Sequence, residues 1–199
     1  MLLTFWQRAV GVVGSVLCVV VLHYPMVAQS TVVEPLSMGD LAAQSQRVVR
    51  ADVVARYVLP HRGDRGEIYT RIELRVRTYL LGDGPREITV QQLGGQIGDI
   101  QMVISGNANF EVGQEVIAYL DYEPSLDLHY VIGLAQGLFV IDSTGPTPTV
   151  HRDLDGLSFY QVIATPMLRL ETVQTLETFL SQFSPRPIGF PTVQEGELR

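Results

Sequence analysis

Lysine is absent from this 199-residue sequence, and cysteine occurs once, as Cys18. All 14 basic residues are therefore arginines, set against 21 Asp and Glu. Without lysine the chain cannot use a Schiff base, a Ser–Lys pair or the lysine of a phosphate-binding loop. A single cysteine cannot form an intramolecular disulfide, so the fold depends on an apolar core, which a chain of this length can build.

Charged residues are also scarce, at 18% of the sequence, while 46% of the residues are hydrophobic. This composition excludes a disordered chain and predicts one globular domain with extensions at its ends. The net charge of −7 argues against a nucleic-acid partner.

The arginines are unevenly distributed along the chain. Residues 47–86 hold nine arginines against five acidic residues, whereas residues 87–150 hold eight acidic residues and no arginine. Two interpretations stay open. The two regions form solvated faces that neutralise each other in the fold, or the first region presents an arginine-rich face to an anionic partner.

Residues 1–30 have the three-part layout of a secretory signal peptide. Arg8 is followed by an uninterrupted apolar or small run over residues 9–22 and by the small-x-small sequence Ala28-Gln29-Ser30. We expect cleavage after Ser30, with Ala28 as the alternative. A retained membrane helix is the other reading, but 14 residues of helix rise only about 21 Å against a hydrocarbon core of about 30 Å. The prediction is a secreted or periplasmic protein that meets a membrane only through this segment.

Helices are expected near both ends of the mature chain. Ser37 and Asp40 form a capping-box pattern that predicts a short helix over 38–47, within an N-terminal helical segment at 31–49. Thr165 as N-cap, Pro166 at the first helical position and apolar residues at helical spacing predict a C-terminal helix within 161–184. We expect this helix to pack on the domain and residues 185–199 to form a flexible tail.

Residues 50–160 read as strands joined by turns. Between Ile68 and Leu80, apolar residues and threonines alternate with tyrosines, arginines and Glu73, which predicts a long strand with one buried face. Further strands are expected at 51–59, 87–93, 116–120, 128–134 and 138–141, with a bulge or tight bend at 135–137. The domain is therefore predicted to be mainly β, as a small antiparallel (OB-like) barrel or a strongly curved sheet with one helix at each end.

Two candidate sites follow from this pattern. The outward face of the long strand would carry two aromatic rings and three guanidinium groups, the set of a surface that stacks sugars or binds anions: Tyr69, Arg71, Arg75, Arg77 and Tyr79. The alternative is a solvated face whose arginines pair with acids on neighbouring strands.

The second candidate is a possible functional loop that contains Gly94, Gly95 and Gly98. Its glycine spacing does not fit a dinucleotide-binding loop, and no lysine is present to hold a phosphate. The alternative reading is a loop that needs glycine for backbone conformations with positive φ.

Catalytic and metal-binding patterns are weak. His151, Asp153 and Asp155 alternate like the start of a calcium loop, but the remaining ligands of such a loop are missing, so we expect no metal site and no cofactor. The sequence has no Gly-x-Ser-x-Gly and no His-Glu-x-x-His motif. A hydrolase that uses carboxylates such as Asp153 and Asp155 stays open, because the fold sets that geometry.

Three motifs carry a resemblance to known proteins: Gly94-Gly95, Phe110-x-x-Gly113-Gln114-Glu115 and Gly133-Leu134-Ala135-Gln136-Gly137. Over residues 37–183 the chain resembles a family of uncharacterised, secreted bacterial β-rich proteins. Its strand order is also distantly similar to the OB-type barrel of tissue inhibitors of metalloproteinases. That similarity implies a protease-binding module, although those inhibitors rely on an N-terminal cysteine and disulfides that this chain lacks.

The expected function is thus an exported, non-enzymatic β-barrel module that binds a protein, an envelope component or an anionic polysaccharide. A protease-binding or inhibitor-like module and a carboxylate-dependent hydrolase are the alternatives.

Overall fold

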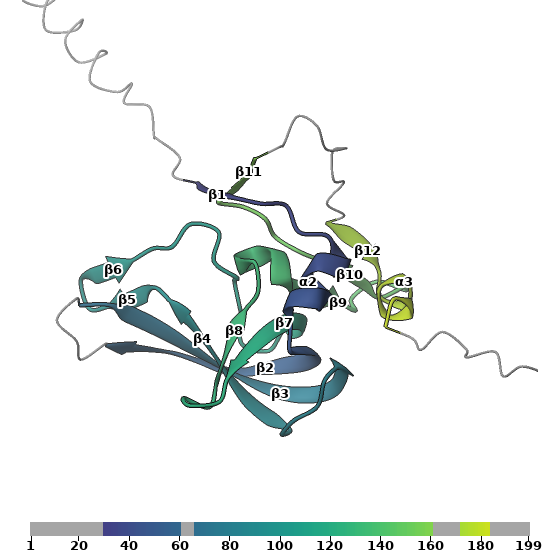
Figure 1. The fold of residues 1–199 in the computed structure, drawn as a ribbon, viewed down its shortest axis with the longest axis horizontal. Coiled ribbons are helices and arrows are strands. Elements are labelled where there is room, and N and C mark those ends of the chain that lie inside the picture. Colours follow the sequence, from purple (N-terminus) through teal and green to yellow (C-terminus); the bar gives the residue numbers. More distant parts are fainter. Residues whose placement is uncertain (1–29, 61–65, 161–171, 184–199) are drawn as a thin grey trace, which may run out of the picture.

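The structure is a computed structural model that describes residues 30–60, 66–160 and 172–183 (Figure 1). The predicted signal peptide (apart from Ser30), the tail at 185–199 and the proposed helix start at Thr165 lie outside these residues. Within them the fold is mainly β, as predicted, and no helix there is long and apolar enough to cross a membrane.

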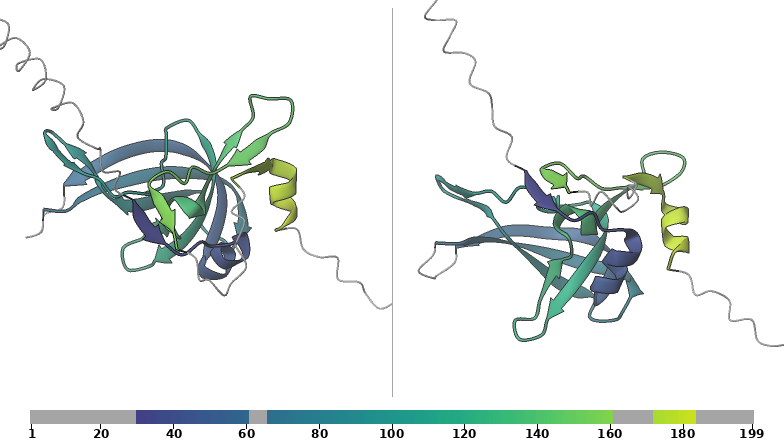
Figure 2. Two further views of the ribbon diagram at one scale, coloured as in Figure 1. Left: turned by 90° about the horizontal axis from the view of Figure 1, so that it is seen from above. Right: turned by 45° about the horizontal axis from the view of Figure 1, so that its top comes forward.

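One large sheet dominates the fold, with the strand order β12-β10-β9-β7-β2-β3-β4-β8 (Figures 1 and 2). Its members are β2 (Arg47–Pro60), β3 (Ile68–Leu81), β4 (Glu87–Leu93), β7 (Glu115–Glu123), β8 (Leu128–Val131), β9 (Leu138–Asp142), β10 (Thr149–His151) and β12 (Val173–Thr175). Because β8 pairs with β7 as well as with β4, strands β2, β3, β4, β8 and β7 close into a ring of five.

The ring is not purely antiparallel, which corrects the sequence-based expectation. Strands β4 and β8 run parallel and share a single register pair, Val90 with His129. The other seams of the ring are antiparallel and have four or more register pairs each. The parallel seam arises because β8 follows β7 in a hairpin yet lies beside β4, a connection that local sequence patterns do not reveal.

The ring encloses the first of two hydrophobic cores. Inward-facing residues of β3 (Ile72, Leu74 and Val76) meet Val49 of β2 and Leu120 of β7, all of them buried. The strand predicted from the alternation after Ile68 is thus confirmed, together with its buried face. Burial of this apolar surface is the main favourable contribution to folding.

A change of phase in β3 moves one predicted surface residue to the inside. Arg50 pairs with Thr78 while Ala51 pairs with Val76, so Arg77 has no partner on β2 and forms a β-bulge. After a bulge the alternation of faces reverses. Tyr79 therefore packs against the core of the ring, and the prediction that it shares the outward face is wrong.

The second core lies on the other face of β7 and β9. Tyr119 and Phe139 pack there against Leu41 of helix α2 (Met38–Gln44) and Phe179 of helix α3 (Leu176–Ser181). Strand β7 is therefore buried on both faces, which explains its continuous apolar run. Helix α2 begins with the predicted capping box of Ser37 and Asp40, but it ends at Gln44 because Ser45 is already extended before β2.

The C-terminal helix is shorter than predicted. Residues 173–175 were expected to be helical, but they form β12, which pairs with the edge strand β10. Helix α3 begins only at Leu176, with Thr175 as its N-cap. The β-branched residues Val173 and Thr175 suit a strand, and the free edge of β10 supplies the partner that the sequence pattern could not show.

The Gly-Leu-Ala-Gln-Gly motif has a structural role. Residues 134–137 form the short 3₁₀ helix η1 (Leu134–Gly137) rather than the predicted bulge. The buried side chain of Gln136 accepts a hydrogen bond from the amide of Leu36 (2.8 Å) and donates one to the carbonyl of Glu34 (3.1 Å). It thereby ties down the segment between α2 and the short strand β1 (Thr31–Val33), which pairs with β11 (Leu157–Phe159).

Candidate functional site

The outward surface of the ring carries a tyrosine–arginine face across four strands. In one register row Tyr57 of β2, Arg71 of β3 and Gln91 of β4 lie side by side. Strands β4 and β8 run parallel, and Val90 on β4 pairs with His129 on β8. The next residues along the two strands, Gln91 and Tyr130, therefore also lie side by side, and Tyr130 continues the row. A second row on β2, β3 and β4 completes the face: Leu59, Tyr69 and Leu93.

Hydrogen bonds orient the centre of this face. Arg71 donates from Nε to Oε1 of Gln91 (3.1 Å), the one hydrogen bond of its guanidinium within the described residues. Its two Nη groups are therefore left to donate to a ligand. Tyr69 donates a hydrogen bond from its hydroxyl to Glu67 (2.8 Å), and this bond is the main cause that raises the pKa of Tyr69. Burial, the charge of Glu67 and the nearby Tyr130 raise this pKa further.

Arg75 lies at the border of the tyrosine–arginine face. It is exposed, and its register neighbours are Asp52 on β2 and Glu87 on β4. Within the described residues it makes no ion pair with either acid, since Asp52 is bound by another arginine. Arg75 can therefore add positive charge to the surface.

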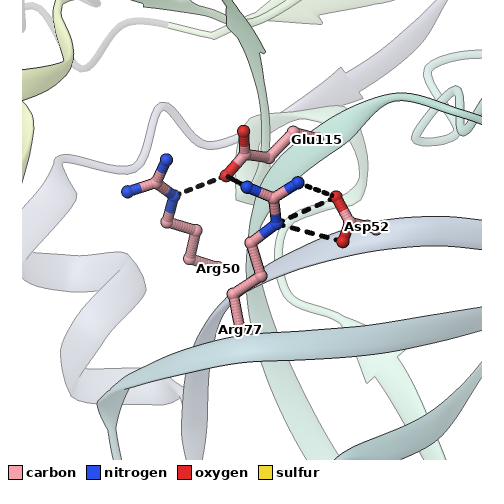
Figure 3. Close-up of polar contacts among 4 residues, drawn as sticks. All are labelled: Arg50, Asp52, Arg77 and Glu115. Atoms are coloured by element: carbon pink, nitrogen blue, oxygen red, sulfur yellow. Dashed lines mark hydrogen bonds and ion pairs between the residues drawn. The ribbon is translucent and has the colours of Figure 1, made fainter.

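Arg77 belongs instead to an ion-pair network that joins β2, β3 and β7 (Figure 3). Its Nε and Nη2 donate to the carboxylate of Asp52 at 2.7–3.0 Å, and its Nη1 lies 3.3 Å from Glu115. Glu115 also accepts a hydrogen bond from Nε of Arg50 (2.6 Å). The hydrogen bond with Asp52 is the main cause that raises the pKa of Arg77. Two arginines and two carboxylates neutralise each other here, so this part of the face is structural.

Tyr79 is also outside the tyrosine–arginine face. Its hydroxyl donates to the carbonyl of Pro85 (2.7 Å) while its ring lies against the inner core, and burial is the main cause that raises its pKa. Of the five predicted face residues, the structure keeps Tyr69, Arg71 and Arg75 on one surface. The alternation within β3 could not reveal Tyr57, Gln91 and Tyr130, because they come from its neighbours.

The glycine-rich region forms a hairpin rather than a loop. Strands β5 (Gly95–Ile97) and β6 (Ile100–Met102) extend beside the ends of β2 and β3 (Figures 1 and 2). A Cβ atom on Gly95 would lie 2.7 Å from Val58 and 2.9 Å from Oγ1 of Thr70, so only glycine allows this close approach. Thr70 donates its hydroxyl to the carbonyl of Gly94 (2.7 Å), and Gly98 has a φ of +56° near the hairpin turn. The close packing at Gly95, the hydrogen bond to Gly94 and the positive φ of Gly98 thus explain all three glycines by the structure of the hairpin.

The other acidic candidates lie apart from this surface. Asp153 and Asp155 are exposed in a turn after β10, where Asp153 accepts a hydrogen bond from the amide of Asp155 (2.9 Å). Among the residues that the structure describes, no three His, Cys, Asp or Glu gather in a way that could hold a metal ion.

Comparison of the chain with protein-family models, with curated proteins and with solved structures finds no match. The resemblances drawn from its motifs stay predictions.

Proposed function

We propose that the five-stranded ring is an OB-type barrel and that the protein is an exported, non-enzymatic module that binds an anionic polysaccharide. The ring order supports the barrel assignment. The fifth ring strand, β8, returns beside the third, β4, and an OB barrel likewise has five strands in a Greek-key order. Export rests on the signal-peptide pattern of residues 1–30.

The observation that carries the ligand assignment is the row Tyr57–Arg71–Gln91–Tyr130. Tyrosine rings present flat apolar surfaces on which sugar rings stack, and a guanidinium donates two parallel hydrogen bonds to a carboxylate or sulfate. The row crosses the strands, so an extended chain would meet a ring at each end and a cation between them. The net charge of −7 would repel a polyanion at a distance, so binding depends on this local arrangement and weakens as salt rises.

The test is calorimetric titration of the purified protein with a short oligogalacturonate and with its uncharged methyl ester. We expect the charged form to bind more tightly at low salt. The variant Arg71→Gln should lower that affinity about tenfold, which corresponds to about 1.4 kcal/mol. Arg56→Gln is the matched control, because exposed Arg56 pairs with the inward-facing Ile72 and so lies off the row.

Equal affinity for the charged and uncharged sugars would contradict the proposal, and so would unchanged binding by Arg71→Gln. The two alternatives have less support. The protease-binding module rests only on strand order, and the hydrolase would need the exposed turn of Asp153 and Asp155 to catalyse a reaction on open surface.

A further inference from the structure

A buried polar cluster closes one end of the ring. His129 is 1% exposed, and its Nε2 lies 2.6 Å from Nη1 of Arg47 at the start of β2. Its Nδ1 lies 3.2 Å from the carbonyl oxygen of Thr89 on β4. Because a guanidinium can only donate, Nε2 must accept, and the one ring proton must sit on Nδ1 and point to Thr89. These contacts require a neutral imidazole.

An aromatic ring holds Arg47 in this position. The ring of Tyr122 on β7 packs against that of His129, with centroids 4.8 Å apart and the two planes tilted by 31°. The guanidinium carbon of Arg47 lies 4.1 Å from the centre of the Tyr122 ring. The Tyr122 hydroxyl donates to Asp127 in the β7–β8 turn (3.0 Å). Arg47 is half-buried and makes no ion pair with an acid within the described residues.

The groups around His129 disfavour a second proton on its ring. Burial is the main cause that lowers the pKa of His129, and the charge of Arg47 lowers it further. The hydrogen bond to Thr89 and the more distant charge of Asp127 act in the opposite direction. On the β3 side, Tyr79 lies near Arg47. Burial is the main cause that raises the pKa of Tyr79, the charge of Arg47 lowers it, and the charge of Asp83 raises it.

The cluster lies at the seam of the ring with the fewest register pairs. His129 forms the single register pair between β4 and β8, with Val90, and its Nδ1–H bond to Thr89 crosses the same seam. On its other side β8 is held to β7 by four register pairs that end in a hairpin turn. Strand β8 can therefore leave β4 without leaving β7.

We propose that protonation of His129 opens the ring between β4 and β8. If Nε2 of His129 gained a proton, it and Nη1 of Arg47 would both be cationic hydrogen-bond donors. They would face each other at the present 2.6 Å with no acceptor between them, which is unfavourable. Movement of β8 away from β4 relieves this contact and admits water. If the proposed function holds, opening also parts Gln91 from Tyr130 and divides the tyrosine–arginine face, so acid would release the ligand.

Hydrogen exchange of the full chain tests this inference without any ligand. Exchange is followed by mass spectrometry from about pH 7.5 to about pH 4.5 and corrected for the intrinsic effect of pH. We expect peptides that cover β4 and β8 to lose about tenfold in protection on acidification, while peptides of β2 and β3 keep theirs. The variant His129→Gln can still accept a hydrogen bond from Arg47 but cannot titrate, so its seam should stay protected. His151→Gln, on β10, is the matched control and should behave as the wild type does.

An equal loss of protection in His129→Gln would overturn the proposal. A seam that stays protected while NMR shows the His129 ring to be protonated would overturn it too. If His129→Gln fails to fold, Arg47→Gln provides the test. Without the guanidinium, opening of the seam should require a lower pH than in the wild type. An unchanged pH midpoint for the loss of protection would contradict the inference. Loss of sugar binding alone would bear on the proposed function and leave this result intact.

Discussion

Arginines in different regions of the same ring meet very different partners. On the outside, Arg77 and Arg50 are held by two carboxylates in a network across three strands (Figure 3). Arg71, on the same strand as Arg77, meets only the neutral amide of Gln91, and Arg47 at the ring end meets a neutral imidazole. Register and the bulge at Arg77 together decide which partner each arginine finds, because Asp52 is in register with Arg75 but is bound by Arg77. An arginine that forms ion pairs with acids contributes to the structure, and one that forms none keeps its charge for another task.

The largest loss of stability is expected when Glu115 is removed from the ion-pair network of Arg50 and Arg77. Its side chain is 16% exposed and forms ion pairs with two arginines, so Glu115→Ala leaves two guanidinium groups without this carboxylate. We expect a loss of about 2 kcal/mol in the free energy of unfolding, measured by urea titration. The matched change in the unpaired region, Gln91→Ala, should cost clearly less, and equal losses would remove the distinction between the regions.

Low pH should distinguish Arg47 from the paired arginines, because its partner His129 is neutral only while its ring carries a single proton. The pKa of His129 is lowered in the folded protein, so below about pH 6.5 the unfolded chain binds the proton more readily than the folded chain does. Stability is therefore full above that pH and falls as pH decreases, with a slope of at most about 1.4 kcal/mol per pH unit for one proton. Urea titrations at several pH values should show this slope for the wild type and a smaller one for His129→Gln.

Neutralisation of Arg77 should separate stability from binding. Arg77→Gln removes the ion pairs with Asp52 and Glu115 but leaves the tyrosine–arginine face unchanged. Since half of its side chain is exposed, we expect a loss of about 1 kcal/mol in unfolding free energy and unchanged affinity for oligogalacturonate. A variant that keeps full stability and loses binding would reverse the roles assigned to Arg77 and Arg71.

The smallest effect is expected at Arg75, which has no ion pair to lose within the described residues. Arg75→Gln should change the unfolding free energy by less than about 0.5 kcal/mol. Its affinity for the charged sugar should fall about twofold at low salt and match the wild type at high salt, because the charge acts only through the surface potential. A large loss of stability would show that Arg75 belongs with the paired arginines.

The same contrast explains which features the sequence predicts. The capping box of Ser37 and the alternation after Ile68 depend on residues a few positions apart, and both predictions are confirmed. Tyr79 was misplaced because the bulge at Arg77 is defined only against β2. The strand at Val173 was missed because it needs the edge of β10.

The tyrosine–arginine face likewise combines residues that a local pattern predicts with residues that only strand pairing brings together. Tyr69 and Arg71 share a strand, so alternation alone places them on one face. Tyr57 and Tyr130 join them only through the pairing of β2 and β8 with their neighbours. The burial of His129 likewise depends on ring closure, since the short run of β8 gives no sign of what covers it.

The hydrogen bonds of Gln136 to Leu36 and Glu34 have a consequence for the order of folding. Their partners are separated by 100 and 102 positions, so the loop that they close spans half of the chain. Contacts of such long range form late, because much of the chain must be ordered before they repay the entropy of closure. During synthesis, these two hydrogen bonds can therefore form only after residue 136 has emerged. Until then, the stretch that joins β1 to α2 lacks the two hydrogen bonds that hold it in the finished fold.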